Sequence, residues 1–206
     1  MSVEVPSLDT ASIGRVIAEG LNAQEFTVHD PAAEDACFMR VMNARAAFSQ
    51  VLISQAGRVT WDYLPFPGRE ADPAQVAGMI VGLLDDETAV VPAVPGGPLG
   101  QSLKDSVDSA LRGSGMRVTR CAPLRDEFGE LCADMTITNP DQPARGEVTL
   151  TDEGMIIWEC RLASAGSAGV SAQEISAIVG RVLSRVQSPE GASAAPAGSR
   201  RRIRRP

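Results

Sequence analysis

The chain has 206 residues, of which 44% are hydrophobic and 22% are charged, and its formal net charge at pH 7 is −7. This composition is typical of a globular protein, and no apolar run approaches the roughly 18 residues that a membrane-spanning helix needs. Residues 1–4 lack the positive region and the apolar core of a secretory signal, so we predict a cytoplasmic protein that does not insert into a membrane.

The charge is distributed unevenly along the chain. Residues 188–206 contain Glu190 and five Arg, which gives them a net charge of +4 and leaves −11 on the rest. An acidic body repels phosphate backbones, so we predict that the folded part does not bind nucleic acid. Residues 188–206 are otherwise rich in Ser, Ala, Gly and Pro, which predicts a disordered tail. This tail contacts an acidic partner, nucleic acid or lipid, or it stays solvated or folds back on the acidic body.

The first part of the chain predicts a helix, four strands and a second helix. The first helix begins with Asp9 or Thr10 as its N-cap and runs to Glu19, and Gly20 ends it. Four strands follow, and the last two form a hairpin; they lie at about 24–29, 36–43, 47–55 and 58–64. Asp72-Pro73 then starts a helix with an apolar stripe at helical spacing, formed by Val76, Met79, Ile80, Leu83 and Leu84.

The same order of elements is predicted for the second part of the chain. A helix at 101–112 precedes four strands at about 116–122, 130–138, 146–151 and 155–162. The closing helix runs from Ser171 to about Gln187, and Ser171 and Glu174 have the spacing of a capping box. Between the two parts, residues 88–100 are rich in Pro and Gly, which predicts a stiff, extended linker.

Apolar positions recur between the two parts at a nearly constant displacement. Four positions of the hairpin that the third and fourth strands form recur 97 residues later: Val51, Ile53, Gly57 and Trp61 correspond to Val148, Leu150, Gly154 and Trp158. We therefore predict an α+β fold of two tandem α-β4-α units, residues 9–87 and 101–187, each an antiparallel meander with its helices on one face. Units of about 85 residues bury too little surface to be stable alone, so we predict that the two pack together as a pseudodimer.

Some strand residues are apolar on the face that the helices should leave uncovered. In the strand at 58–64, Val59, Trp61 and Tyr63 alternate with polar residues, but the strand at 155–162 is apolar on nearly both faces. We therefore predict that the second face is covered by the other repeat or by a partner. The candidate binding surface consists of large apolar side chains of these strands: Phe38, Met39, Met42, Trp61, Tyr63, Met155, Ile157 and Trp158.

The residues that could carry chemistry do not form a recognisable motif. The four Cys lack CxxC or Cys/His spacing and have apolar neighbours, which predicts buried free thiols. His29, the only histidine, is expected at the end of a strand, and a pair that it forms with Cys37 or Cys132 is the enzyme alternative. Asp62 and Glu159 are expected on the outward face of the sheet, in solvent. We predict no catalytic residues, no cofactor and no metal site.

The order of helix, antiparallel meander and helix in a small acidic unit resembles the type III secretion chaperone and YbjN-like fold. The resemblance covers about residues 9–187 and rests on element order, acidity and the paired sheet pattern. Proteins of that class work as dimers that hold extended segments of a client. The resemblance therefore implies that this tandem chain supplies the dimer within one chain.

We predict that the chain is a non-catalytic chaperone or adaptor that binds a peptide or protein client. Lys104 is the only lysine beside many Arg, Ala, Gly and Pro, a bias that suggests a GC-rich bacterial genome. One use would be as an accessory subunit that presents a precursor peptide or escorts an enzyme in a biosynthetic or secretion complex. Two alternatives stay open: an enzyme subunit with a Cys/His site, and a self-assembling structural protein.

Overall fold

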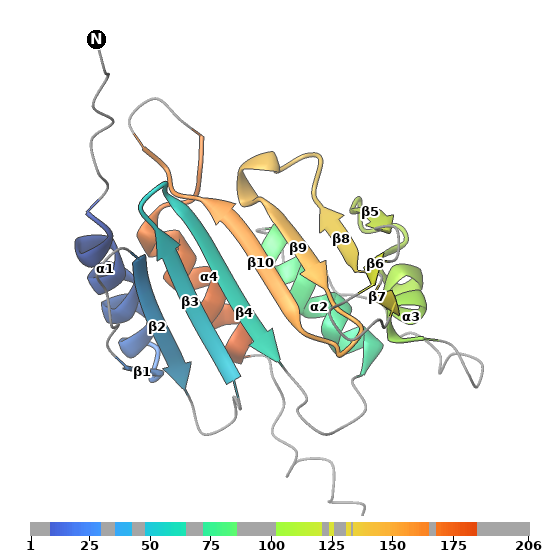
Figure 1. Cartoon of the computed structure of the whole chain (residues 1–206), viewed down its shortest axis with the longest axis horizontal. Helices are drawn as coiled ribbons and strands as arrows, with labels where there is room; N and C mark the ends of the chain where they lie inside the picture. The colour runs from blue at the N-terminus through green and yellow to red at the C-terminus, as the bar shows by residue number, and fades with distance from the viewer. Residues whose placement is uncertain are drawn as a thin grey trace, which may run out of the picture.

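The computed structural model of the chain is an α+β fold (Figure 1). It describes residues 9–29, 36–42, 48–64, 72–85, 102–120, 124–125, 131–132, 134–164 and 168–184. The α-helices in these residues are α1 (Thr10–Asn22), α2 (Pro73–Leu84), α3 (Leu103–Leu111) and α4 (Ala172–Ser184). The predicted linker at 88–100 and the predicted tail at 188–206 lie outside the described residues, and the domain boundaries stay predictions.

The strands of the first part are β1 (Thr27–His29), β2 (Ala36–Met42), β3 (Phe48–Ser54) and β4 (Arg58–Leu64). The second part contributes β5 (Arg117–Arg120), β8 (Met135–Thr138), β9 (Glu147–Leu150) and β10 (Ile156–Arg161). A short 3-10 helix, η1 (Pro143–Arg145), lies between β8 and β9. The small strands β6 (Leu124–Arg125) and β7 (Leu131–Cys132) pair only with each other among the described residues.

The other eight strands form one continuous antiparallel sheet in the order β1-β2-β3-β4-β10-β9-β8-β5. The two parts of the chain therefore meet edge to edge, through β4 and β10, rather than face to face. In this register Trp61 lies opposite Trp158, and Tyr63 lies opposite Ile156. The predicted α+β class and the antiparallel meanders are confirmed, whereas the tandem duplication stays a prediction.

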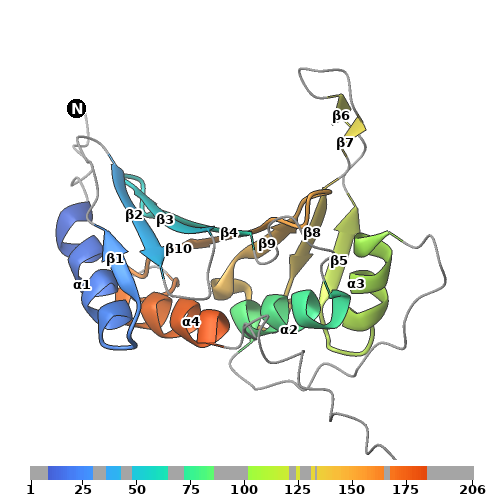
Figure 2. The same ribbon diagram turned by 90° about the horizontal axis from the view of Figure 1, so that it is seen from below.

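All four described α-helices lie on one face of the sheet (Figure 2), as the sequence predicts. The closing helix of each part covers strands of the other part. Helix α2, from the first part, packs against β9 and α3, while α4, from the second part, packs against α1. Helix α2 is buried around most of its circumference because it also contacts α4 at the centre of the layer. None of the described helices is both long and apolar enough to cross a membrane.

The core lies between the helices and the sheet. Alternation in β4 buries Val59, Trp61 and Tyr63 and leaves the intervening residues partly exposed, as predicted. The Trp61 and Tyr63 rings stack with their centroids 5.2 Å apart. Each buried indole donates a hydrogen bond of 2.7 Å, Trp61 to the Ser49 hydroxyl and Trp158 to the Arg145 carbonyl. Packing and hydrogen bonding therefore hold both indole rings in the core.

Helix ends show where local sequence signals succeed and where packing overrides them. The capping box of α4 is present: Ser171 N donates to Glu174 Oε2 at 2.8 Å, and Glu174 N donates to Ser171 Oγ at 3.2 Å. The predicted end of α1 at Gly20 is wrong, because the helix continues to Asn22. A Cβ at Gly20 would overlap the Ser176 side chain of α4, so this glycine permits close helix packing and does not end the helix.

Candidate functional site

The structure divides the predicted binding surface between the two faces of the sheet. Four of its members lie in the core beneath the helices and are at most 1% exposed: Met39, Trp61, Tyr63 and Trp158. Phe38 and Ile157 lie on the opposite face and are half-buried, and Met155 is half-buried just before β10. Met42 ends β2, and its side chain lies outside the described residues. The eight residues thus do not form one surface, because neighbouring strand residues point to opposite faces.

We call the face of the sheet that points away from the helices the open face. It carries the strand residues that alternate with buried ones, for example Gln50 and Leu52 of β3, Thr60 and Asp62 of β4, and Thr149 of β9. Gln50 Nε2 donates to Asp62 Oδ2 at 2.7 Å across the β3–β4 ladder. Leu52 is 40% exposed, the most exposed large hydrophobic side chain among the described residues. The open face is therefore mainly polar, with a few apolar side chains.

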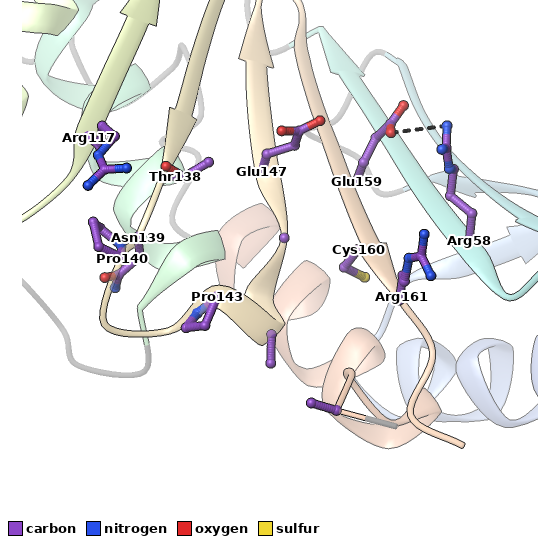
Figure 3. Close-up of a pocket in the computed structure, with 13 residues that line it drawn as sticks. Arg58, Arg117, Thr138, Asn139, Pro140, Pro143, Glu147, Glu159, Cys160 and Arg161 are labelled. Atoms are coloured by element: carbon purple, nitrogen blue, oxygen red, sulfur yellow. Dashed lines mark ion pairs between the residues drawn. The ribbon is translucent and has the colours of Figure 1, made fainter. Parts of the chain in front are cut away.

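A hollow of about 560 Å³ lies at one end of the open face (Figure 3). Strand residues of β4, β5, β8, β9 and β10 form its floor and sides, and residues of the segment 139–146, between β8 and β9, form its rim. The rim is fastened to the C-terminal end of α2. Asn139 Nδ2 donates to the Leu84 carbonyl at 3.1 Å, and Gln142 Nε2 donates to Asp85 Oδ1 at 2.8 Å. The shape of the hollow therefore depends on the core beneath it.

Gly146 fixes the junction between the rim and the floor. Its φ angle is 79°, in the region that favours glycine. A Cβ at this position would overlap the backbone carbonyl of Glu159 in β10. The rim backbone can therefore lie directly against β10 only because residue 146 has no side chain.

Five charged side chains line the hollow: Arg58, Arg117, Arg161, Glu147 and Glu159. Two cross-strand pairs bring like charges together, since Glu159 lies opposite Glu147 and Arg161 lies opposite Arg58. Arg58 Nη1 and Glu159 Oε2 form an ion pair at 3.5 Å. Arg117, on β5, lies opposite Thr138 at the far side of the hollow. Within the described residues, Arg117, Arg161 and Glu147 form no ion pair of 4.0 Å or less.

Cys160 lines the hollow, but its thiol is buried beneath it. Its side chain belongs to the core, and the residue is 3% exposed. Burial raises the pKa of this thiol to about 12, so it stays protonated near neutral pH. His29 lies on the edge strand β1, which is separated from β10 by β2, β3 and β4. The side chains of Cys37 and Cys132 lie outside the described residues, so the enzyme alternative that uses them stays a prediction.

Of the charged residues that line the hollow, the sequence pattern singles out only Glu159, which is expected on the outward face in solvent. The structure places Glu159 on the open face, where it is partly exposed and forms an ion pair with Arg58. The signal that could have identified Glu147 and Arg161 is the same alternation, applied to every charged strand residue. Their neighbourhood with Arg58 follows only from the pairing of β4 with β10, which no local pattern encodes.

Among the described residues, no group of three or more His, Cys, Asp or Glu side chains is arranged to hold a metal ion. The site is instead a charged hollow next to a broad, partly apolar sheet surface. No protein-family model, curated protein or solved structure matches the chain.

Proposed function

We propose that the chain is a non-catalytic chaperone or adaptor and that it binds a protein or peptide client on the open face. The observation that carries this proposal is the arrangement of one continuous sheet with every described α-helix on the same side. A sheet face that no described helix covers, yet bears Phe38, Leu52 and Ile157, has the composition of a protein interface with a few apolar anchors.

The size of the open face supports a specific complex. Eight strands about 4.8 Å apart span roughly 34 Å, and their lengths of mostly four to seven residues correspond to about 13–23 Å. The area is thus on the order of 600 Å², comparable with the roughly 800 Å² that each partner contributes to a standard interface. A client that covers most of this face, including the hollow, would form a complex of ordinary size.

The rigidity of the open face also supports binding. Its strands are backed by the buried residues of the core, including Trp61 and Trp158 with their satisfied indole N–H groups. A surface that is already ordered loses little conformational entropy when a client binds, so more of the contact energy contributes to affinity. This matters most for an extended client segment, because such a segment loses conformational entropy of its own when it becomes ordered on binding.

The finer parts of the proposal follow from the sequence. The opposition of Trp61 and Trp158 at the β4–β10 junction supports the view that the chain is a fused pseudodimer, like the chaperones that it resembles. We propose that it works in the cytoplasm of a bacterium, as an accessory subunit that presents a precursor peptide or escorts an enzyme. The acidic body disfavours nucleic acid as the client.

Site-specific photo-crosslinking in cells that naturally express the chain tests this proposal. A photoreactive residue at Thr60, on the open face of β4, should give one discrete adduct with a client protein. The matched control is the same residue at Ala177, which is exposed on α4 on the other side of the molecule, and it should not give that adduct. Equal adducts from both positions, or an adduct only with a second copy of the chain, would overturn the proposal; the latter result would favour the self-assembling alternative.

A further inference from the structure

The hollow contains a charge arrangement that is unfavourable for the protein alone. Glu147 and Glu159 lie directly opposite each other on neighbouring strands, and so do Arg58 and Arg161. Like charges at directly opposed positions destabilise a sheet. The Arg58–Glu159 ion pair relieves part of this repulsion, but it leaves Glu147 and Arg161 without an ion pair among the described residues. Features that cost stability in this way are typical of functional sites.

We infer that the hollow recognises a client segment of mixed charge, in which two acidic groups flank one basic side chain. This inference rests on the proposed function and names the chemistry of the client. Arg117 and Arg161 would each bind a carboxylate, and Glu147, which lies between them, would bind the basic group. The hollow thereby gains the opposite charges that its own side chains do not supply.

The spacing of the three groups suits an extended peptide that crosses the strands. Strand β5 is separated from β9 by β8 alone, and β9 pairs directly with β10. With strands about 4.8 Å apart, Arg117 lies two spacings, about 10 Å, from Glu147. Arg161 lies one strand across and two residues along β10 from the position opposite Glu147, which is about 8 Å away, so the two arginines are on the order of 15 Å apart. In an extended peptide, side chains on one side repeat every 7 Å or so, and three of them span about 14 Å. The predicted recognition pattern is therefore acidic-x-basic-x-acidic.

Ligands of a single charge fit this arrangement less well. A polyanion would meet Glu147 and Glu159 on the floor of the hollow, within a body that is acidic overall. A purely basic segment would meet the guanidinium groups of Arg58, Arg117 and Arg161 at both sides. Only a segment that alternates in sign pairs favourably with all of these groups.

Defined peptides test the inference by fluorescence anisotropy at low ionic strength. The probe is a labelled peptide with the core Glu-Ser-Lys-Ser-Glu, compared with Lys-Ser-Glu-Ser-Lys, Glu-Ser-Glu-Ser-Glu and Gln-Ser-Gln-Ser-Gln in the same flanking sequence. The full-length chain should bind the first peptide about tenfold more tightly than each of the others, as expected for three solvent-exposed ion pairs. Equal affinity for the mixed and the all-acidic peptides would overturn the inference.

Charge-reversal variants locate the binding in the hollow. The double variant Arg117→Glu/Arg161→Glu should reduce the affinity for the mixed peptide to that for the neutral one. Its control, Arg15→Glu/Arg112→Glu, makes the same change in net charge at exposed positions outside the hollow and should retain the roughly tenfold preference. Glu147→Arg should shift the preference to the all-acidic peptide. Equal losses in the hollow and control variants would assign the binding to net charge and overturn the inference.

The two proposals fail in different ways. If the Thr60 adduct forms in the wild-type chain and persists unchanged in Arg117→Glu/Arg161→Glu, the open face binds a client but mixed-charge recognition is wrong. If Thr60 forms no client adduct in the wild-type chain, the proposed function itself is wrong. Thermal unfolding should show that every variant is folded, and the hollow variants should be at least as stable as the wild type, because Glu147→Arg and Arg161→Glu each replace a pair of opposed like charges with a pair of opposite charges.

Discussion

Trp61 and Trp158 lie opposite each other in the register of β4 and β10, where the two parts of the sheet join. Both side chains are fully buried on the helix-covered face, and both indole N–H groups have hydrogen-bond acceptors. The two Trp side chains thus stabilise the junction between the two parts of the sheet, and the open face carries smaller apolar side chains and charged ones.

Trp61→Ala is expected to reduce the free energy of unfolding by about 3–5 kcal/mol, because it removes a buried aromatic ring and leaves a cavity. Leu52→Ala is the control, since Leu52 is 40% exposed on the open face and should cost less than about 1 kcal/mol. Urea unfolding followed by circular dichroism measures both. A loss below about 1 kcal/mol for Trp61→Ala would mean that this side chain is not part of the core.

Gly146→Ala is expected to be much more destabilising than Gly113→Ala. Both glycines have positive φ, 79° and 88° respectively, so both substitutions carry a similar conformational cost of about 1 kcal/mol. Only at Gly146 would the new methyl group overlap backbone atoms, those of Glu159, whereas nothing lies within 4 Å of a Cβ at Gly113. Denaturant unfolding should show an additional loss of about 2 kcal/mol or more for Gly146→Ala, and equal losses would contradict the close contact between rim and β10.

Gly20→Ala should destabilise the chain although alanine favours a helix by about 1 kcal/mol over glycine. The added methyl group would overlap the Cβ and hydroxyl of Ser176, so the cost arises between α1 and α4. Ser176→Gly in the same chain should restore most of the lost stability, and a double-mutant cycle measures this coupling. Independent, additive effects of the two substitutions would show that the helices do not pack as described.

Stability should fall at alkaline pH because Cys160 is buried as a neutral thiol. Its pKa is raised by burial from the ordinary value of 9.0 to about 12, so the unfolded chain ionises at lower pH than the folded one. The contribution of the thiol is fully present below pH 9, falls by up to 1.4 kcal/mol or so per pH unit above that value, and is lost by about pH 12.

Denaturant unfolding at about pH 8 and pH 10, with a reductant present, measures this dependence. The Cys160→Ala variant should lose about 1 kcal/mol less than the wild type between these two pH values. Identical pH profiles for the two proteins would show that the thiol is accessible to solvent in the folded state.

The local elements of the fold could be predicted because their signals are short-range. The Asp72-Pro73 start of α2 and the Ser171–Glu174 capping box are both present, and β4 occupies the predicted residues 58–64. The error at Gly20 has a tertiary cause, since the reason for that glycine is a side chain of α4 more than 150 residues away. Patterns within one segment do not contain such a contact.

The candidate site was harder to predict because it depends on which strands become neighbours. The sequence indicated that Ile156, Ile157 and Trp158 are apolar, but the structure separates Ile157 from the other two by placing it on the open face. The hollow combines Arg117 of β5 with Arg58 of β4, and these strands are related only through the complete sheet order. Each charged residue of the hollow could therefore be identified in the sequence, but the sequence did not show that these residues lie close together.

The crossing of the closing helices has a consequence for how the protein opens. Because α2 completes the helix layer under β9 and α4 completes the layer beside α1, neither part of the chain can detach without uncovering the other's buried side chains. Local opening should therefore require nearly the full free energy of unfolding, and the slowest amide hydrogen exchange should be similar in β3 and β9. A client that binds at only one end of the sheet therefore contacts a single cooperative unit, and any distortion that it causes there is opposed by the stability of both parts of the chain.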